Sequence, residues 1–240
     1  MNILVTGGSG FLGQALCRAL LAQGHTVRSY PRGFSPALAQ LGVRQTLGAL
    51  HDKTALRVAM QQQHGVLHNA AKASGWGTWQ DFYQTNVLGT QCIIEVCREL
   101  GIGKLLYTST PSVVHAGRKP VAGGNERDTP YGSRFTAHYP HSKMLAERAV
   151  LAANDVSLAT LALRPRLDVR EPARNGDLDR LVVAKLEVQE RVLLDSAPVA
   201  AVEAVAADHV ERARHPAPLA PGHDQQAALG HGGADDGAKA

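Results

Sequence analysis

The run TGGSGFLG at Thr6–Gly13 decides the fold class of this 240-residue chain. It follows the apolar stretch Asn2–Thr6, which predicts a strand, and it opens Phe11–Gln23, whose leucines and alanines recur at helical spacing. A strand, a glycine-rich turn and a helix in this order are typical of a dinucleotide-binding unit. In such a unit Gly7 permits the tight turn, and Gly13 lets the helix pack close to the strand.

The same run predicts where an anionic cofactor binds. Gly10 lets the backbone approach a pyrophosphate, and the N–H groups of Phe11 and Leu12 at the start of the helix have no partner within it. The helix dipole adds partial positive charge at that end. A glycine-rich turn without function is the alternative, and the flanking strand and helix favour the phosphate site.

Residues 1–167 alternate apolar strand patterns with helical patterns. Six strands separated by helical segments predict an α/β fold with a Rossmann-type, doubly wound parallel sheet. Gly24 and Gly101 are expected to end two of the helices. The expected strands are Asn2–Thr6, Thr26–Tyr30, Val43–Leu47, Val66–Asn69, Lys104–Thr108 and Ala159–Leu163, and the expected helices are Phe11–Gln23, Asp81–Leu100 and Tyr139–Ala153.

Residues 168–240 differ in composition from the rest of the chain. They contain no Phe, Tyr, Trp, Ile, Met, Cys or Thr, and a segment without large side chains buries little area on folding. We therefore expect a domain at residues 1–167 and a separate tail at residues 168–240. The tail is expected to be helical at Leu178–Leu194 and disordered beyond about Arg212.

Charge, hydropathy and cysteines bound the partners and the compartment. Residues 1–167 carry 17 Lys and Arg against 8 Asp and Glu, which suits an anionic cofactor. The same charge would permit nonspecific nucleic-acid binding, but we expect none because the sequence has no nucleic-acid motif. No stretch approaches the roughly 18–20 apolar residues of a membrane span, and the N-terminus lacks the pattern of a signal peptide. Three cysteines in helical patterns are expected to be buried, reduced thiols, which predicts a cytoplasmic protein. They have no His or Cys neighbours at the spacing of metal ligands, so no metal site is expected.

The residues after the second expected strand bear on the choice between NAD and NADP. An acidic side chain there would bind the ribose hydroxyls of NAD. The run Val27–Gly33 contains no acid, and Arg32 could pair with the 2′-phosphate of NADP through charge-assisted hydrogen bonds. A solvated surface arginine is the alternative. We favour NADP(H) over NAD(H) as the cofactor.

Tyr139 and Lys143, in the run YPHSK, stand four residues apart and therefore share one face of a helix. Pro140 suits the first turn of that helix. An ammonium beside a phenol favours the phenolate and lowers the pKa of the phenol toward the working pH. Such a tyrosine can give a proton to a carbonyl oxygen while a hydride reaches the carbon. A pair on an exposed helix surface is the alternative.

Six runs resemble, in order, the motifs of extended short-chain dehydrogenases of the 3β-hydroxysteroid dehydrogenase group. Within that group the chain is most similar to the bacterial 2-alkyl-3-oxoalkanoate reductases. The resemblance covers about residues 1–167. The matching runs are Thr6–Gly13, His68–Lys72, Asn86–Thr90, Tyr107–Val113, Tyr139–Lys143 and Leu163–Pro165.

The resemblance implies a role for several polar side chains. Tyr139 would be the acid/base, and Lys143 would hold the nicotinamide ribose. Thr110 would orient the substrate through its hydroxyl, with Ser109 as the alternative because the run of hydroxyls leaves the register open by one. Asn86 stands where the family has a helix distortion and a proton relay, and a satisfied helix-interior amide is the competing interpretation.

The resemblance also implies contacts with the adenosine part of the cofactor. Ala70 and Ala71 would line that side, where small residues let a cofactor lie close. Leu50 ends the run Gly48–Leu50, which reads Gly-Ala-Leu where family members usually have Gly-Asp-Leu, so the acid that contacts adenine is missing. His68 is expected to be a packed strand residue rather than a catalyst.

The likeness ends after Pro165, where the family continues into a substrate-binding lobe, so this lobe is absent or unrecognisable. A shifted reading frame or a natural truncation with an unrelated tail would explain the loss. Three functions therefore stay open. The first is an enzyme that interconverts the ketone and the secondary alcohol of a bulky apolar small molecule, steroid-like or a 2-alkyl-3-oxoacid. The others are a module that binds NADP(H) without turnover, and a sugar-nucleotide epimerase or dehydratase. Intact Tyr139 and Lys143 favour the enzyme, and a homodimer is left open beside a monomer.

Overall fold

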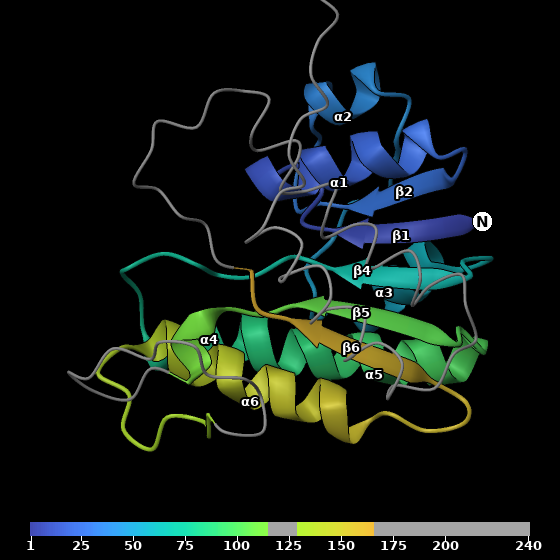
Figure 1. Cartoon of the computed structure of the whole chain (residues 1–240). Coiled ribbons are helices and arrows are strands. Elements are labelled where there is room, and N and C mark those ends of the chain that lie inside the picture. Colours follow the sequence, from blue (N-terminus) through green and yellow to red (C-terminus); the bar gives the residue numbers. More distant parts are fainter. Residues whose placement is uncertain (115–128, 166–240) are drawn as a thin grey trace, which may run out of the picture.

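Residues 1–114 and 129–165, which the computed structural model describes, form a parallel six-stranded sheet with helices on both faces (Figure 1). The strand order is β3-β2-β1-β4-β5-β6, and every neighbouring pair is parallel. This is the doubly wound order, and it confirms the predicted fold class. The strands are β1 (Asn2–Thr6), β2 (Thr26–Tyr30), β3 (Arg44–Gln45), β4 (Gly65–His68), β5 (Lys104–Thr108) and β6 (Ala159–Leu163).

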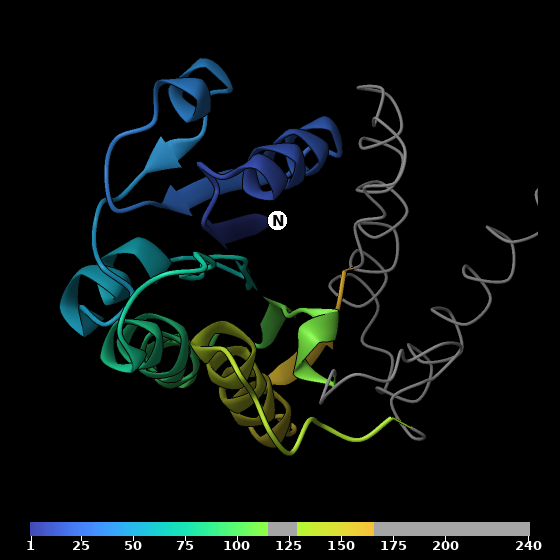
Figure 2. The ribbon, with the colours of Figure 1, turned by 90° about the vertical axis from the view of Figure 1, so that its left-hand side faces the viewer.

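Helices cover both faces of the sheet (Figure 2). An apolar cluster of side chains holds them against each face. Side chains alternate between the faces along a strand, so Ile3 and Val5 of β1 pack with α1 and α2, while Leu4 packs with α3, α5 and α6. These helices are α1 (Phe11–Ala22), α2 (Pro36–Gln40), α3 (Lys53–Met60), α5 (Gly89–Leu100) and α6 (His138–Ala152).

The expected helix Asp81–Leu100 is divided into three parts. A short helix α4 (Trp79–Phe82) comes first, then a π-helical segment at Tyr83–Leu88, and then α5. The helix begins earlier than expected because Thr78 and Asp81 form a capping box, in which each side chain accepts a hydrogen bond from the other's backbone N–H.

The other boundaries lie close to the expected ones. The strand expected at Val43–Leu47 is shorter, as β3, although Thr46 N–H still donates to the Ser29 carbonyl at 3.0 Å. Gly101 has a φ of 68° and ends α5, and Gly24 has a φ of 80° just after α1. Glycine suits these positions because the left-handed conformation is unfavourable for residues with a Cβ.

The carboxyl ends of all six strands meet at one edge of the sheet, on the left in Figure 1. α1 and α6 both start at this edge, and the strand order reverses between β1 and β4. Ligands of doubly wound sheets bind at such a switch point, so this edge is where a site is expected.

Three other predictions concern the tail, membrane-spanning helices and the cysteines. The tail at residues 168–240, with its expected helix and disorder, lies outside the described residues. Among the described helices, none is long and apolar enough to cross a bilayer. Cys17 and Cys97 are buried, as expected, whereas Cys92 is only half-buried.

Candidate functional site

The glycine-rich turn presses against the end of β4. Gly7 has a φ of 68°, and a Cβ placed on it would lie 2.8 Å from the backbone N and Cα of Ala70. A Cβ on Gly13 would lie 2.0 Å from the carbonyl oxygen of Gly7. Both positions therefore require glycine to keep the turn, the helix and the neighbouring strand in contact.

The start of α1 has no side-chain partner for its backbone N–H groups. Gly10 is the N-cap residue, and no side chain caps the helix. Phe11 is 66% exposed, so the N–H groups of the first turn lie beside an accessible surface. An uncapped helix start of this kind can bind an anion.

A chain of buried hydrogen bonds through His68 links β1, β4 and the π-helical segment. Nδ1 of His68 lies 2.8 Å from Thr6 Oγ1, and Nε2 lies 2.9 Å from Thr90 Oγ1. The Thr90 hydroxyl donates to the carbonyl oxygen of Asn86 at 2.6 Å, so it accepts from His68. The proton therefore resides on Nε2, and Nδ1 accepts from Thr6. Burial lowers the pKa of His68 to about 3, with a smaller contribution from Lys143, so the ring is neutral.

The Thr6 hydroxyl also fixes the backbone after β4. It accepts hydrogen bonds from the N–H groups of Asn69 and Ala70, each at 3.1 Å. Its two lone pairs and its proton are then all used, which agrees with the assignment of the proton on His68. His68 is thus a packed strand residue, and it holds the glycine turn and β4 in register.

Tyr139 and Thr110 are brought together at the carboxyl edge. Tyr139 lies in the first turn of α6, Thr110 follows β5, and the Thr110 hydroxyl lies close enough to the phenol to act on its pKa. Ser109 is buried, and its hydroxyl donates to the carboxylate of Glu147. Of the two hydroxyls that the sequence left open, Thr110 is therefore the one beside the phenol.

The sequence predicted a lowered pKa for Tyr139, and the structure corrects this. Burial raises the pKa of Tyr139, and the nearby Thr110 hydroxyl opposes that effect without overcoming it. The buried Lys143 side chain turns to other partners. Desolvation of the phenol therefore outweighs the effect of the neighbouring hydroxyl.

Lys143 is 2% exposed and lies one helical turn after Tyr139. Its Nζ donates to the Thr108 carbonyl at 2.7 Å and lies 4.0 Å from the centroid of the Tyr107 ring. Burial lowers the pKa of Lys143 from 10.5 to about 7, and the charge of Glu147 acts in the opposite direction. The charge state of this side chain therefore changes close to neutral pH.

Asn86 lies within the π-helical segment, at the expected helix distortion. Its Oδ1 accepts from the Lys72 N–H at 2.7 Å, and its Nδ2 donates to the Lys72 carbonyl at 3.1 Å and to Ser142 Oγ at 2.9 Å. Ser142 in turn donates to the Tyr139 carbonyl at 2.8 Å. The amide is thus fully bonded, and it joins the segment after β4 to the first turn of α6.

The remaining residues predicted to bind the cofactor lie around the same edge, with one difference. Arg32 is exposed just after β2, and Ala70 and Ala71 are half-buried just after β4. The Leu50 side chain is only 8% exposed and packs in the core, where a Cβ on Gly89 would lie 2.6 Å from its Cβ. The Leu50 side chain therefore packs against α5, and its contact with the adenosine part of the cofactor stays a prediction.

Glu147 is a buried group of this region that the sequence analysis did not identify. It is 1% exposed, and Arg164 donates to its carboxylate at 2.6 Å. The available signal is its spacing, since Glu147 follows Lys143 by four residues among apolar neighbours on the inner face of α6.

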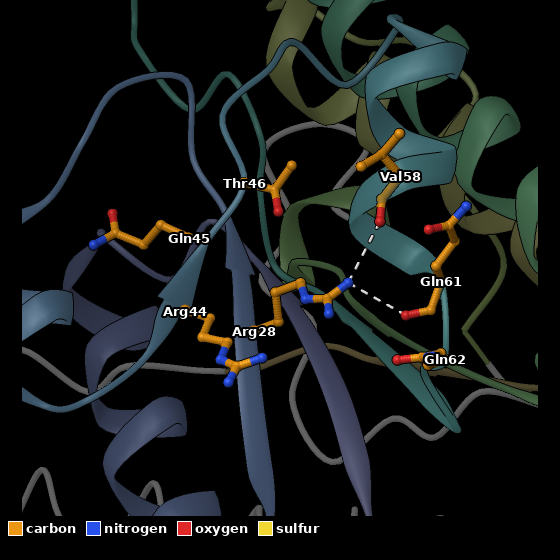
Figure 3. Close-up of a pocket in the computed structure, with 7 residues that line it drawn as sticks. All are labelled: Arg28, Arg44, Gln45, Thr46, Val58, Gln61 and Gln62. Atoms are coloured by element: carbon orange, nitrogen blue, oxygen red, sulfur yellow. Dashed lines mark hydrogen bonds between the residues drawn. The ribbon is translucent and has the colours of Figure 1, made fainter.

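A cavity of about 480 Å³ lies at the outer part of the sheet, away from these residues (Figure 3). The Arg28 guanidinium points to the end of α3 and donates to the carbonyls of Ala59 at 2.8 Å and Gln61 at 3.2 Å. Arg28 thus caps a helix C-terminus, and none of the predicted site residues lines the cavity. The lining residues are Arg28, Arg44, Gln45, Thr46, Val58, Gln61 and Gln62.

The sheet order, the glycine turn and the Tyr–Lys pair on one helix define an extended short-chain dehydrogenase/reductase domain. Within this class the chain belongs to the 3-beta hydroxysteroid dehydrogenase/isomerase family, whose model matches residues 4–171. This confirms the resemblance drawn from the motif runs.

Curated relatives share this part of the chain. A 2-alkyl-3-oxoalkanoate reductase of Stenotrophomonas maltophilia (strain K279a) is 52% identical over 167 residues, which are 70% of this chain and 51% of the relative. A 3 beta-hydroxysteroid dehydrogenase/Delta 5-->4-isomerase of Mycobacterium tuberculosis (strain ATCC 25618 / H37Rv) is 39% identical over 174 residues, 68% of this chain and 46% of the relative. The chain thus spans about half the length of the curated relatives it matches.

Solved structures show the same architecture. The UDP-glucose 4-epimerase of Thermus thermophilus in complex with NAD matches with a TM-score of 0.61 and 25% identity, covering 79% of this chain and 62% of that one. The dTDP-glucose 4,6-dehydratase of Bacillus anthracis str. Ames in complex with NAD has a TM-score of 0.63 and 20% identity, covering 82% of this chain and 73% of that one. The second likeness concerns the fold alone.

Proposed function

We propose that this chain is an NAD(P)-dependent oxidoreductase that interconverts a secondary alcohol and a ketone, with NADP(H) preferred over NAD(H). The observation that carries the proposal is the placement of the Thr110 hydroxyl beside the Tyr139 phenol, one helical turn from the buried Lys143. The proposed substrate is bulky and apolar, a 2-alkyl-3-oxoalkanoate or a 3β-hydroxysteroid. The names of the two curated relatives support these classes.

The glycine turn fits the pyrophosphate of a dinucleotide. At Gly13 the packing of the protein itself requires glycine, as the 2.0 Å approach to the Gly7 carbonyl oxygen shows. At Gly10 a Cβ would meet no protein atom closer than 3.4 Å, so the protein alone does not exclude a side chain there. A phosphate bound to the N–H groups of Phe11 and Leu12 accounts for glycine at this position.

The residues at the carboxyl edge fit the two halves of the reaction. A bound nicotinamide supplies or accepts the hydride at the substrate carbon. In the direction of reduction, Tyr139 gives its phenolic proton to the developing alkoxide, and the Thr110 hydroxyl donates to the same oxygen. Lys143, one helical turn further along α6, holds the nicotinamide ribose.

Turnover of the full chain tests the chemistry. NADPH oxidation is measured with a 2-alkyl-3-oxoacid and with a 3-ketosteroid. Tyr139→Phe is expected to lower the rate by roughly 10²–10⁴-fold, the usual range for a general acid, while NADPH binding stays near that of the wild type. Tyr83→Phe, on the π-helical segment, is the matched control.

Two results would favour the other functions. Tight NADPH binding without ketone reduction would favour the binding module. Conversion of UDP-glucose by the wild type would favour an epimerase, which the likeness to the Thermus thermophilus epimerase makes the natural comparison.

Calorimetric binding of each cofactor tests the preference for NADP(H). Arg32 lies exposed after β2, in a run without an acid. Arg32→Ala is expected to weaken NADPH binding about 10- to 100-fold, because hydrogen bonds to charged groups contribute about 1.5–3 kcal/mol, and to leave NADH binding unchanged. Arg44→Ala, on β3, is the control. Tighter binding of NADH than of NADPH by the wild type would contradict the preference.

A further inference from the structure

Glu147 is a buried carboxylate on the same helix as the two proposed functional groups. It follows Tyr139 by eight residues and Lys143 by four, which places all three along one face of α6. A carboxylate that is 1% exposed is costly to bury unless it is paired and hydrogen-bonded. The partners of Glu147 come from three segments outside α6.

These partners join the carboxyl ends of two strands to the helix. Ser109, just after β5, donates its hydroxyl to the Glu147 carboxylate. Arg164, just after β6, donates through Nη2 at 2.6 Å and Nε at 3.0 Å, and the Tyr131 phenol donates at 3.0 Å. The Ser109 N–H also donates to the Leu163 carbonyl at 2.6 Å. The carboxylate therefore fastens β5 and β6 to α6 immediately beside the site.

The position of Thr110 depends on this anchoring of the strand end. Thr110, whose hydroxyl lies beside the Tyr139 phenol, directly follows Ser109 in the chain. A shift of Ser109 would therefore move the hydroxyl that is proposed to contact the substrate.

Charge is the second link between Glu147 and the site. Lys143 is surrounded by neutral groups from β4 and β5, and burial lowers its pKa, while Glu147 raises it. Arg164 is the cation that is bonded to Glu147, at 2.6 Å. The groups that face or adjoin Lys143 are the Tyr107 ring and Thr108 carbonyl of β5, the neutral His68 of β4, and Tyr139 and Glu147 of α6.

We propose that Glu147 is a positioning residue of this site, whose buried carboxylate fastens the strand end that carries Thr110 and keeps the Lys143 side chain as an ammonium. The proposal rests on the proposed function, because it concerns the lysine that would hold the cofactor. It assigns Glu147 no contact with the substrate.

The direct test is the titration of Lys143 in the full chain, followed by NMR of ¹³C-labelled lysine ε-carbons. The chain has seven lysines, and the signal of Lys143 is identified by its loss in Lys143→Arg. Glu147→Gln is expected to lower the titration midpoint by about one pH unit or more, which changes the ratio of ammonium to amine about tenfold at a fixed pH. Arg164→Gln is expected to raise the midpoint, because it removes the cation that offsets Glu147.

Glu99→Gln is the matched control, since it removes an exposed carboxylate that pairs with Lys53 at 2.7 Å on the far side of α5 from the site. It is expected to leave the Lys143 midpoint unchanged. Circular dichroism reports whether each variant is folded, and if Glu147→Gln does not fold, Arg164→Gln decides alone. A folded Glu147→Gln or Arg164→Gln protein whose Lys143 midpoint equals that of the wild type overturns the proposal and leaves Glu147 a structural role only.

The titration needs neither cofactor nor ketone, so its outcome is separate from the proposed function. Shifted midpoints in a chain that reduces no ketone would refute the proposed function and retain Glu147 as the group that sets the charge of Lys143. Ketone reduction with unshifted midpoints would refute only the proposal on Glu147.

Discussion

Replacing His68 tests whether the buried hydrogen-bond chain depends on a neutral imidazole. In His68→Phe the ring still packs against Tyr107, whose centroid lies 5.3 Å from that of His68. The Thr6 hydroxyl loses its acceptor, and a buried donor without a partner costs about 1–3 kcal/mol. The free energy of unfolding at pH 7.5 should fall by about this amount.

The effect of pH on this comparison follows from the pKa of His68. The folded value, about 3, lies below the ordinary value of 6.5, so between these two values the unfolded chain binds the proton more strongly. The stability from neutral His68 is therefore complete above pH 6.5 and is lost as the pH falls toward 3. At pH 5 the wild type should have lost about 2 kcal/mol from this source, since one pH unit corresponds to about 1.4 kcal/mol. His68→Phe lacks this loss.

Urea unfolding at pH 7.5 and pH 5, followed by circular dichroism, measures both effects. The deficit of His68→Phe relative to the wild type should shrink or reverse at pH 5. His64→Phe, which removes a ring that accepts from the Asn2 N–H at 2.8 Å, controls for the loss of another histidine. An equal deficit of His68→Phe at both pH values would refute the assignment of a neutral ring.

Three further changes probe the glycine turn, the buried Asn86 amide and an exposed ion pair. Gly13→Ala should abolish dinucleotide binding or folding, measured by calorimetry and circular dichroism, because its Cβ would lie 2.0 Å from a carbonyl oxygen, whereas Gly103→Ala, with no atom nearer than 3.8 Å, should be tolerated. Asn86→Ala should cost about 2–4 kcal/mol in urea unfolding, because it leaves the Lys72 backbone groups without their buried partners. Glu99→Gln should leave the midpoint of urea unfolding close to that of the wild type, and closer still at high salt, because its ion pairs are exposed.

The parts that the sequence predicted well are those in which local pattern and tertiary structure agree. The glycine run predicted the strand, the turn and the helix around it, since Gly7 and Gly13 each meet a steric requirement of the turn itself. The spacing of Tyr139 and Lys143 predicted that they share a helix face, and they lie on α6 as expected.

The parts that the sequence did not predict depend on contacts between distant segments. The local sequence does not indicate that Lys143 is buried, because the groups that contact its Nζ belong to Tyr107 and Thr108, 35 or more residues earlier in the chain. Glu147 looks like an ordinary helical glutamate because Ser109 lies 38 residues before it and Arg164 lies 17 after it. The raised pKa of Tyr139 follows from burial, which local spacing does not report.

The position of residue 1 matters for anyone who attaches this domain to a support or a fusion partner. β1 runs through the middle of the sheet from the amino edge, so Met1, whose amino group lies 3.2 Å from His25 Nδ1, is at the end of the strand opposite the glycine turn (Figure 1). A linker joined there would leave the domain on the side away from Tyr139. Immobilisation through the N-terminus should therefore present the carboxyl edge to the solution, with no need for a long spacer.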